Sequence, residues 1–238
     1  MLLEVAGLKK SFGSIIVADD LDLAIAPGEA VGIIGPNGAG KTTLFNLIAG
    51  SLSPTAGSIR FDGRDLSGMS PQARCRAGLG RTHQIPQPFE KLTVFENLLV
   101  GAVHGRRKTE REVAQHCGEI LERLGLLKHA NTLSGSLTLL ERKRLEMARA
   151  LATAPKLLLL DEIAGGLTEG ECSELVATIR EIRQTGVAIL WIEHVVHALL
   201  AVIDRLVVLN FGRKIAEGVP KQVMQLAEVH QIYIGIEA

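Results

Sequence analysis

Gly35-Pro36-Asn37-Gly38-Ala39-Gly40-Lys41-Thr42 is the stretch of sequence that decides the fold of this chain. It lies between residues 30–34, an apolar run typical of a buried strand, and residues 43–49, whose apolar side chains have helical spacing. A glycine-rich turn before a helix lets backbone N–H groups point at phosphate oxygens, and the positive end of the helix strengthens the attraction. Lys41 can reach the β- and γ-phosphates, and the Thr42 hydroxyl can bind Mg²⁺. The stretch, with Thr43 next to it, therefore predicts a nucleoside triphosphate site.

The composition of the chain excludes several other classes of protein. The 238 residues include 26 Lys and Arg against 26 Asp and Glu, so no net charge attracts nucleic acid, and no nucleic-acid partner is expected. Hydrophobic residues make up 47%, yet no uncharged apolar run approaches the roughly 20 residues needed to span a bilayer. Three widely spaced cysteines match no metal or disulfide pattern. The N-terminus lacks the features of a signal peptide, so we expect a cytoplasmic protein.

The order of strand and helix patterns predicts an α/β fold with two additions. Residues 2–25 alternate as antiparallel strands do, and Asp62-Gly63 after residues 58–61 is a hairpin signal. Between residues 94 and 151 the pattern becomes helical, notably over 110–124 and 139–151. Strands are then expected at 156–160, 186–192 and 206–210, with a helix at 169–183. We therefore expect one domain over residues 1–238. Its mostly parallel core and antiparallel β lobe would lie at about 1–93 and 152–238, and its helical lobe at about 94–151.

Two carboxylates end the apolar run Leu157–Leu160. Such a run is typical of a buried parallel strand, and α/β folds place ligands at the carboxyl ends of parallel strands. Asp161 is then the expected Mg²⁺ partner of Thr42. Glu162 is the expected general base that orients and deprotonates an attacking water. A solvated acidic turn would be the ordinary interpretation if the phosphate-binding loop were absent.

Two further polar residues are expected at the same edge of the sheet. His194 follows the strand that ends at Ile192, and it is expected to contact the γ-phosphate, although a lone histidine there often has a structural role. Gln84 follows another short strand at residues 79–83 and can bind Mg²⁺ or hold the water.

Taken in order, the phosphate-binding loop, Gln84, the Asp161-Glu162 pair and His194 resemble the ATPase subunit of ATP-binding cassette transporters. The resemblance covers essentially the whole chain. It implies an ATPase whose cofactors are ATP and Mg²⁺, and a dimer that sandwiches two ATP molecules. Each ATP would lie between the phosphate-binding loop of one chain and the signature segment of the other. The resemblance also implies that Phe12 stacks on adenine, the alternative being a core aromatic.

The signature segment departs from the family's usual L-S-G-G-Q. Ala148-Arg149-Ala150-Leu151 fixes the register and places Leu137-Thr138-Leu139-Leu140-Glu141 at the signature, four residues after Leu133–Ser136, which looks closer by eye. Thr138 keeps a hydroxyl for the nucleotide. We expect Leu140 to block the close approach that glycine permits, and Glu141 to bring a negative charge near a triphosphate. Thr168 also departs from the usual Asp or Asn of the dimer-contact loop.

Residues 80–84, 89–97 and 190–194 resemble the branched-chain amino acid uptake branch of the family, although His83 replaces a usual phenylalanine. The expected partners are separate transmembrane permease subunits and a second ATPase chain, identical or different. The chain itself would be peripheral on the inner face of the cell membrane. The alternative is the ATPase of an export or lipopolysaccharide system. A non-transport cassette protein fits less well, because those generally carry two cassettes or a long coiled-coil insertion, and a P-loop kinase also fits poorly.

Overall fold

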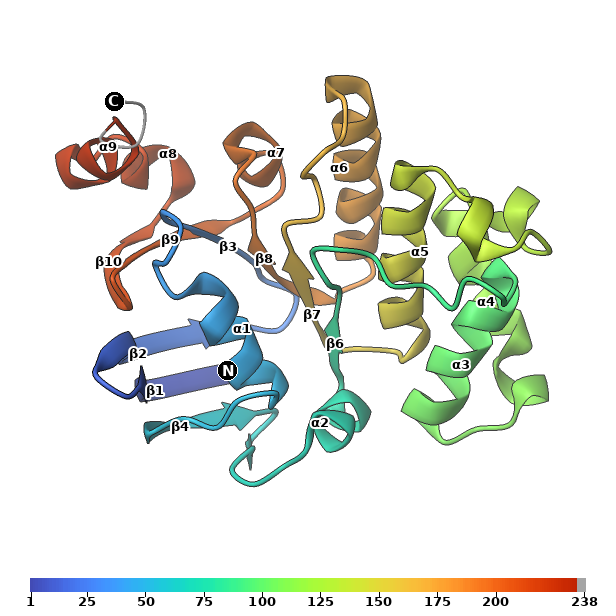
Figure 1. The fold of residues 1–238 in the computed structure, drawn as a ribbon, viewed down its shortest axis with the longest axis horizontal. Helices are drawn as coiled ribbons and strands as arrows, with labels where there is room; N and C mark the ends of the chain where they lie inside the picture. The colour runs from blue at the N-terminus through green and yellow to red at the C-terminus, as the bar shows by residue number, and fades with distance from the viewer. Residues whose placement is uncertain (235–238) are drawn as a thin grey trace.

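The computed structural model describes residues 1–234 and contains two β-sheets with helices around them (Figure 1). The first sheet is antiparallel and comes from the first 65 residues, as the sequence pattern predicts. Its strand order is β2-β1-β4-β5, with β1 at Leu3–Phe12, β2 at Ile15–Ile25, β4 at Ala56–Phe61 and β5 at Arg64–Asp65. Asp62 and Gly63 connect β4 to β5 at positive φ, so the predicted hairpin is confirmed.

The second sheet forms the core and is mostly parallel, which confirms the predicted fold class. Its order is β10-β9-β3-β8-β7-β6, with β3 at Ala30–Ile34, β6 at Leu79–Arg81, β7 at Leu157–Asp161, β8 at Ala188–Ile192, β9 at Arg205–Asn210 and β10 at Arg213–Gly218. Every neighbouring pair is parallel except β9 with β10. Strand β10 is not predicted from the sequence pattern.

Both faces of the core sheet are buried, which explains its uninterrupted apolar strands. Leu157 and Leu159 of β7 belong to the hydrophobic cluster between the two sheets, whereas Leu158 and Leu160 belong to the cluster on the opposite face. Helix α1, at Lys41–Ala49, packs between the two sheets and contributes Leu44, Phe45, Leu47 and Ile48 to the first cluster (Figure 1).

The remaining helices are α2 at Pro71–Ala77, α3 at Val94–Arg106, α4 at Glu110–Arg123, α5 at Leu139–Ala152, α6 at Glu169–Gln184, α7 at Val196–Leu200, α8 at Pro220–Val223 and α9 at Ala227–Ile234. Among them, α6 and α7 cover the face of the core sheet opposite α1, whereas α8 and α9 lie beyond one end of the sheet and α3, α4 and α5 beyond the other (Figure 1). Short 3-10 turns occupy Leu127–His129 and Ser134–Ser136. Within residues 1–234, none of these helices has the length and apolar composition needed to cross a membrane.

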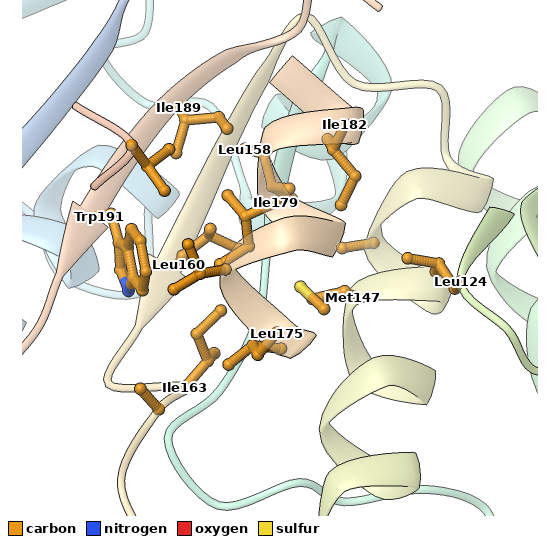
Figure 2. Packing of buried hydrophobic residues seen from close by; sticks show 14 of the residues in the cluster. Leu124, Met147, Leu158, Leu160, Ile163, Leu175, Ile179, Ile182, Ile189 and Trp191 are labelled. Carbon is orange, nitrogen blue, oxygen red and sulfur yellow. The ribbon is translucent and has the colours of Figure 1, made fainter. Parts of the chain in front are cut away.

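Helices α3 to α5 form the helical segment between β6 and β7, and α5 joins this segment to the core. Figure 2 shows Met147 of α5 pointing toward α6, where Leu175 and Ile179 lie between it and the core strands. Leu160 of β7 and Trp191 of β8 complete this packing, and all five side chains are fully buried. The position of α5 is therefore tied to the strands that carry the predicted site.

Four helices begin with the same N-terminal capping arrangement. Each of α3, α4, α5 and α6 has a threonine at the N-cap and a glutamate three residues later. In every case the glutamate carboxylate accepts hydrogen bonds from the threonine backbone N–H and from its hydroxyl. This capping box satisfies donors that a helix start otherwise leaves unpaired. The four pairs are Thr93 with Glu96, Thr109 with Glu112, Thr138 with Glu141, and Thr168 with Glu171.

Candidate nucleotide-binding and hydrolysis site

Residues 35–40 connect β3 to α1, where the sequence predicts a phosphate-binding loop. A Cβ atom on Gly35 would lie 2.2 Å from the Leu209 carbonyl oxygen, and one on Gly40 would lie 2.4 Å from the Val17 carbonyl oxygen. Only glycine fits at such distances, so both positions fix the path of the loop. Helix α1 starts after Gly40 without a side-chain cap. Its first N–H groups are therefore free of a capping side chain and are suited to an anion.

The loop forms one wall of a pocket of about 200 Å³. The lining residues are Val17, Asn37, Gly38, Ala39, Gly40, Lys41, Thr42, Thr43 and Glu162. The pocket thus brings the phosphate-binding loop and the predicted general base to one place.

Lys41 is buried in the loop that it serves. Its Nζ donates to the carbonyl oxygens of Gly35 at 2.7 Å and Pro36 at 3.0 Å. Burial lowers the pKa of the Lys41 ammonium, while the nearby Glu162 and Asp161 carboxylates raise it. Phosphate oxygens carry charge and accept more strongly than carbonyl oxygens, so an incoming triphosphate can replace these two partners.

Asp161 ends β7 and has a partner, Arg81, that was not among the predicted site residues. The Nη2 atom of Arg81 lies 3.0 Å from Asp161 Oδ2, and Arg81 Nη1 donates to Asn46 Oδ1 of α1 at 2.7 Å. Burial raises the pKa of Asp161, and the hydrogen bond from Arg81 opposes that rise. Arg81 ends β6, the strand paired with β7. The signal that could have revealed it is this shared sheet edge.

Three residues predicted for the site, Glu162, Gln84 and His194, contact one another through the Glu162 carboxylate. Gln84 Nε2 donates to Glu162 Oε2 at 2.5 Å, and His194 Nε2 lies 2.9 Å from Glu162 Oε1. The Glu162 backbone has φ of 46°, a conformation that is strained for a residue other than glycine and that is concentrated at functional sites. Its N–H donates to the Ile192 carbonyl oxygen at 2.9 Å, which helps to hold it. The carboxylate is thus oriented from two sides beside the phosphate-binding pocket.

Two predicted nucleotide contacts lie outside this pocket. Phe12 is 48% exposed, so it is not the core aromatic considered as its alternative, and the Lys10 ammonium lies 4.9 Å from its ring centroid. Thr138 is the N-cap of α5 and is engaged by Glu141. Neither residue lines the 200 Å³ pocket. Their contacts with nucleotide remain predictions.

The structure supports the chosen signature register. Helix α5 begins directly after Thr138, whereas the rival Ser134 is buried in a 3-10 turn and donates its hydroxyl to the Phe89 carbonyl oxygen. The expectation for Leu140 is wrong. Its side chain is only 7% exposed because the helix directs it into the core, and Leu139, at 44%, occupies the surface instead.

The carboxylate of Glu141 is also held in place by neighbouring groups of this chain. Its carboxylate accepts from the N–H and the hydroxyl of Thr138, and its Oε1 lies 2.8 Å from His129 Nε2. The Thr138 backbone hydrogen bond lowers the pKa of Glu141, so the group stays ionised but is turned toward its own helix terminus. Thr168 caps α6 in the same way.

A phosphate-binding loop after β3, a carboxylate pair at the end of β7 and a helical segment carrying a signature helix together define an ATP-binding cassette. The family profile described as "ABC transporter" matches residues 18–165, and the chain belongs to this family. It is an ABC transporter ATPase, in which ATP hydrolysis is coupled to transport. ATPases of this family dimerise and work with permease subunits.

Full-length relatives include two amino acid transport proteins and one lipopolysaccharide protein. The chain is 39% identical to the high-affinity branched-chain amino acid transport ATP-binding protein LivG of Escherichia coli K12, with 98% of each chain covered. It is 36% identical to the equivalent protein BraF of Pseudomonas aeruginosa, again with 98% of each covered. It is 35% identical to the lipopolysaccharide export system ATP-binding protein LptB of Haemophilus influenzae, with 98% of this chain and 97% of the relative covered.

Solved structures confirm the fold. A nucleotide-free ATP-binding cassette from an ABC transporter has a TM-score of 0.90 and 32% identity, covering 98% of this chain and 99% of that one. An ADP-bound cassette has a TM-score of 0.90 and 33% identity, with 98% of each chain covered.

Proposed function

We propose that this chain is the ATPase subunit of an importer of branched-chain amino acids. The support is the 39% and 36% identity to two transport ATPases of that name over almost their whole length. Residues 80–84, 89–97 and 190–194 also resemble that branch. The 35% identity to a lipopolysaccharide export ATPase makes lipopolysaccharide export the second candidate.

We infer that Glu162 is the general base of ATP hydrolysis, and the observation that carries this is its placement. Its carboxylate lies at the phosphate-binding pocket with Gln84 on one oxygen and His194 on the other. A base fixed in this way can orient a water toward the γ-phosphate and accept its proton. His194 remains close enough to the same region to contact that phosphate.

The residues at the pocket also fit a magnesium nucleotide. Residues 35–43 would hold the phosphates, and Thr42, which lines the pocket, would hold Mg²⁺ together with Asp161 and Gln84, which lie beside the pocket residue Glu162 in sequence and by hydrogen bond respectively. Mg²⁺ prefers hydroxyl, carboxylate and amide oxygens. When bound, the metal neutralises charge on the phosphates. Phe12 would stack on the adenine, since its ring is exposed.

The proposed assembly has two ATPase chains beneath separate permease subunits on the inner face of the membrane. Each ATP would lie between residues 35–43 of one chain and the signature segment at Thr138 of the other. A second chain of the same or a different sequence would complete each site.

Transport by the reconstituted complex tests the substrate class. The chain is purified with the permease subunits and the binding protein of its transport system and is placed in proteoliposomes containing Mg-ATP. We expect ATP-dependent uptake of labelled leucine, isoleucine or valine, and loss of uptake in a Glu162→Gln control. ATPase activity without amino acid uptake, combined with extraction of lipopolysaccharide by the complex, would instead support the export candidate.

A further inference from the structure

Arg81 is a charged side chain at the edge of the core sheet for which the mechanism above gives no role. It ends β6, and its side chain is only 14% exposed. Its Nη2 lies 3.0 Å from Asp161 Oδ2 on β7, and its Nη1 donates to Asn46 Oδ1 on α1 at 2.7 Å. One planar guanidinium thus bridges the strand that carries Asp161 and the helix that starts at the phosphate-binding loop.

Asn46 and Phe45 connect Arg81 to the helix that carries Thr42. Asn46 lies about one turn after Thr42 on α1, so the two side chains share one face of that helix. The ring of the fully buried Phe45 lies with its centroid 5.9 Å from Arg81 Cζ, a distance at which an aromatic face attracts a cation. The guanidinium is therefore held against α1 by an amide and by an aromatic ring.

The residue after Arg81 holds the backbone of Asp161. Thr82 is fully buried, and its N–H donates to the Leu159 carbonyl oxygen at 2.9 Å. Its hydroxyl oxygen accepts a hydrogen bond from the Asp161 N–H at 3.2 Å. Asp161 is thus fixed at its backbone by Thr82 and at its carboxylate by Arg81. The bond from Arg81 uses Oδ2, so the carboxylate keeps Oδ1 as a second oxygen for a metal ion.

The two proposed metal ligands Thr42 and Asp161 come from elements that strand pairing does not join directly. Thr42 lies on α1, which follows β3, and Asp161 ends β7. In the core sheet β8 lies between β3 and β7. Mg²⁺ demands nearly ideal octahedral geometry, so the separation of its ligands has to be set accurately. The side-chain contacts of Arg81 join α1 to β7 and can set it.

We propose that Arg81 is a positioning residue for the metal ion: fixed to Asn46 of α1, its guanidinium sets the Asp161 carboxylate at the distance from Thr42 that Mg²⁺ bound with ATP requires. This inference rests on the proposed Mg²⁺ role of Asp161 and Thr42. An effect of charge alone would have the opposite sign, because a cation beside the carboxylate repels Mg²⁺. The direction in which metal affinity changes therefore separates positioning from charge.

Binding of Mn²⁺, a paramagnetic substitute for Mg²⁺, measures the metal site without turnover. The full chain, in excess over a non-hydrolysable ATP analogue, is titrated with Mn²⁺ and followed by electron paramagnetic resonance. We expect Arg81→Met to weaken Mn²⁺ binding on the order of tenfold, as loss of a group that orients a metal ligand does. Arg81→Lys keeps the charge but cannot bridge both partners, so it should lose part of this affinity. Exposed Arg111→Met is the matched control, and thermal melting checks that each variant is folded.

Unchanged or tighter Mn²⁺ binding in Arg81→Met would overturn the proposal, as would wild-type binding in Arg81→Lys. Asp161→Asn distinguishes this failure from failure of the proposed metal site. If Asp161→Asn binds Mn²⁺ as the wild type does, the metal role of Asp161 is wrong. If Asp161→Asn weakens binding and Arg81→Met does not, only the positioning role is wrong.

A double-mutant cycle tests whether Asn46 acts through Arg81. Asn46→Leu removes the acceptor on α1 at similar volume, and it should weaken Mn²⁺ binding in the same direction but by less. The double variant Arg81→Met/Asn46→Leu should bind Mn²⁺ no more weakly than Arg81→Met alone, because the bridge is already lost. Multiplying defects would overturn the bridge. If Arg81→Met does not fold, Arg81→Lys and Asn46→Leu decide by the same criteria.

Discussion

Among single residues, Glu162 has the most closely defined surroundings. Each oxygen of its carboxylate has a partner, Gln84 on one side and His194 on the other, and its own backbone is held in a left-handed conformation. Because two separate segments, at Gln84 and at residues 192–194, fix this one group, its direction is set before nucleotide binds. Such preorganisation lets a general base act on a water without first reorienting.

Replacing Glu162 by glutamine should separate ATP binding from hydrolysis. The amide keeps the shape and one acceptor oxygen but cannot take a proton, so we expect the hydrolysis rate to fall by roughly 10²–10⁴-fold. The affinity for Mg-ATP should be nearly preserved, and the ATP-bound dimer should accumulate. Phosphate release and nucleotide binding are measured with the partner subunits present. Wild-type turnover in the variant would show that Glu162 is not the base.

Lys41→Ala should instead impair nucleotide binding or turnover directly. The change removes the ammonium that is buried among the loop carbonyls and lies nearest the expected phosphates. Binding is measured by equilibrium titration with a fluorescent ATP analogue, and exposed Lys221→Ala is the control. Equal affinity and turnover in the Lys41 variant and the wild type would contradict a role of the loop in nucleotide binding.

Site residues could be predicted from the sequence where their pattern lies within one short stretch of the chain. Residues 35–42 form an unbroken motif, and Asp161 with Glu162 ends an apolar run, so both are visible without a structure. Arg81 was missed because its contact with Asp161 depends on the register of β6 against β7, which no nearby spacing records. Gln84 and His194 were placed at the right edge, but their common contact with Glu162 appears only in the fold.

At the scale of elements, the capping of α5 and α6 explains why Glu141 and Thr168 depart from the family pattern. Thr138 with Glu141 and Thr168 with Glu171 are capping boxes, the same device that begins α3 and α4. The residues that look unusual for a nucleotide contact are therefore favourable for beginning a helix. The capping pattern was readable from the sequence, whereas β10 was not, because its exposed edge buries only Ala216 and leaves little alternation.

Thr138→Ala should weaken the start of α5. The substitution removes the hydroxyl that caps Glu141 N–H and contacts the Glu141 carboxylate. We expect the free energy of unfolding to fall by about 1 kcal/mol, the usual cost of losing an N-cap side chain. Urea unfolding measures the change, with Thr138→Ser as the matched control that keeps the hydroxyl. A variant as stable as the wild type would show that the cap contributes little here.

The four capping glutamates should make stability depend on acid pH. Hydrogen bonds from the preceding threonines lower the pKa of Glu96, Glu112, Glu141 and Glu171 below 4.5 in the folded chain. A carboxyl with a lowered folded pKa stabilises the fold above its unfolded pKa, and this stabilisation is lost as pH falls through the folded value. The free energy of unfolding should therefore decrease below about pH 4.5. Changing all four to glutamine should flatten this decrease, and an unchanged acid profile would contradict the assignment.

At the scale of the whole molecule, the proposed dimer makes the two ATP sites unequal when the partner chain differs. This chain has a complete phosphate-binding loop, but its signature presents exposed Leu139 and ionised Glu141. We expect the site that uses this chain's Glu162 and the partner's signature to hydrolyse faster. Replacing the catalytic glutamate of each chain in turn by glutamine measures the contribution of each site. If activity survives the loss of Glu162 and is abolished by the loss of the partner's glutamate, the site that contains the partner's glutamate is the faster one, and the prediction is wrong.

Because the helical segment leaves and re-enters the core sheet at neighbouring strands, it could be exchanged between related genes. Chain leaves the core sheet at β6 and returns at β7, and these two strands are direct neighbours, with Gly80 opposite Leu158. Paired strands lie only about 5 Å apart, so residues 82–156 could be replaced by the same stretch of a relative without changing strand order. Such a recombinant would receive a foreign residue at position 147 and keep its own Leu175 and Ile179, against which that residue packs (Figure 2). Compatibility at that buried interface, rather than topology, would then decide which recombinants remain active.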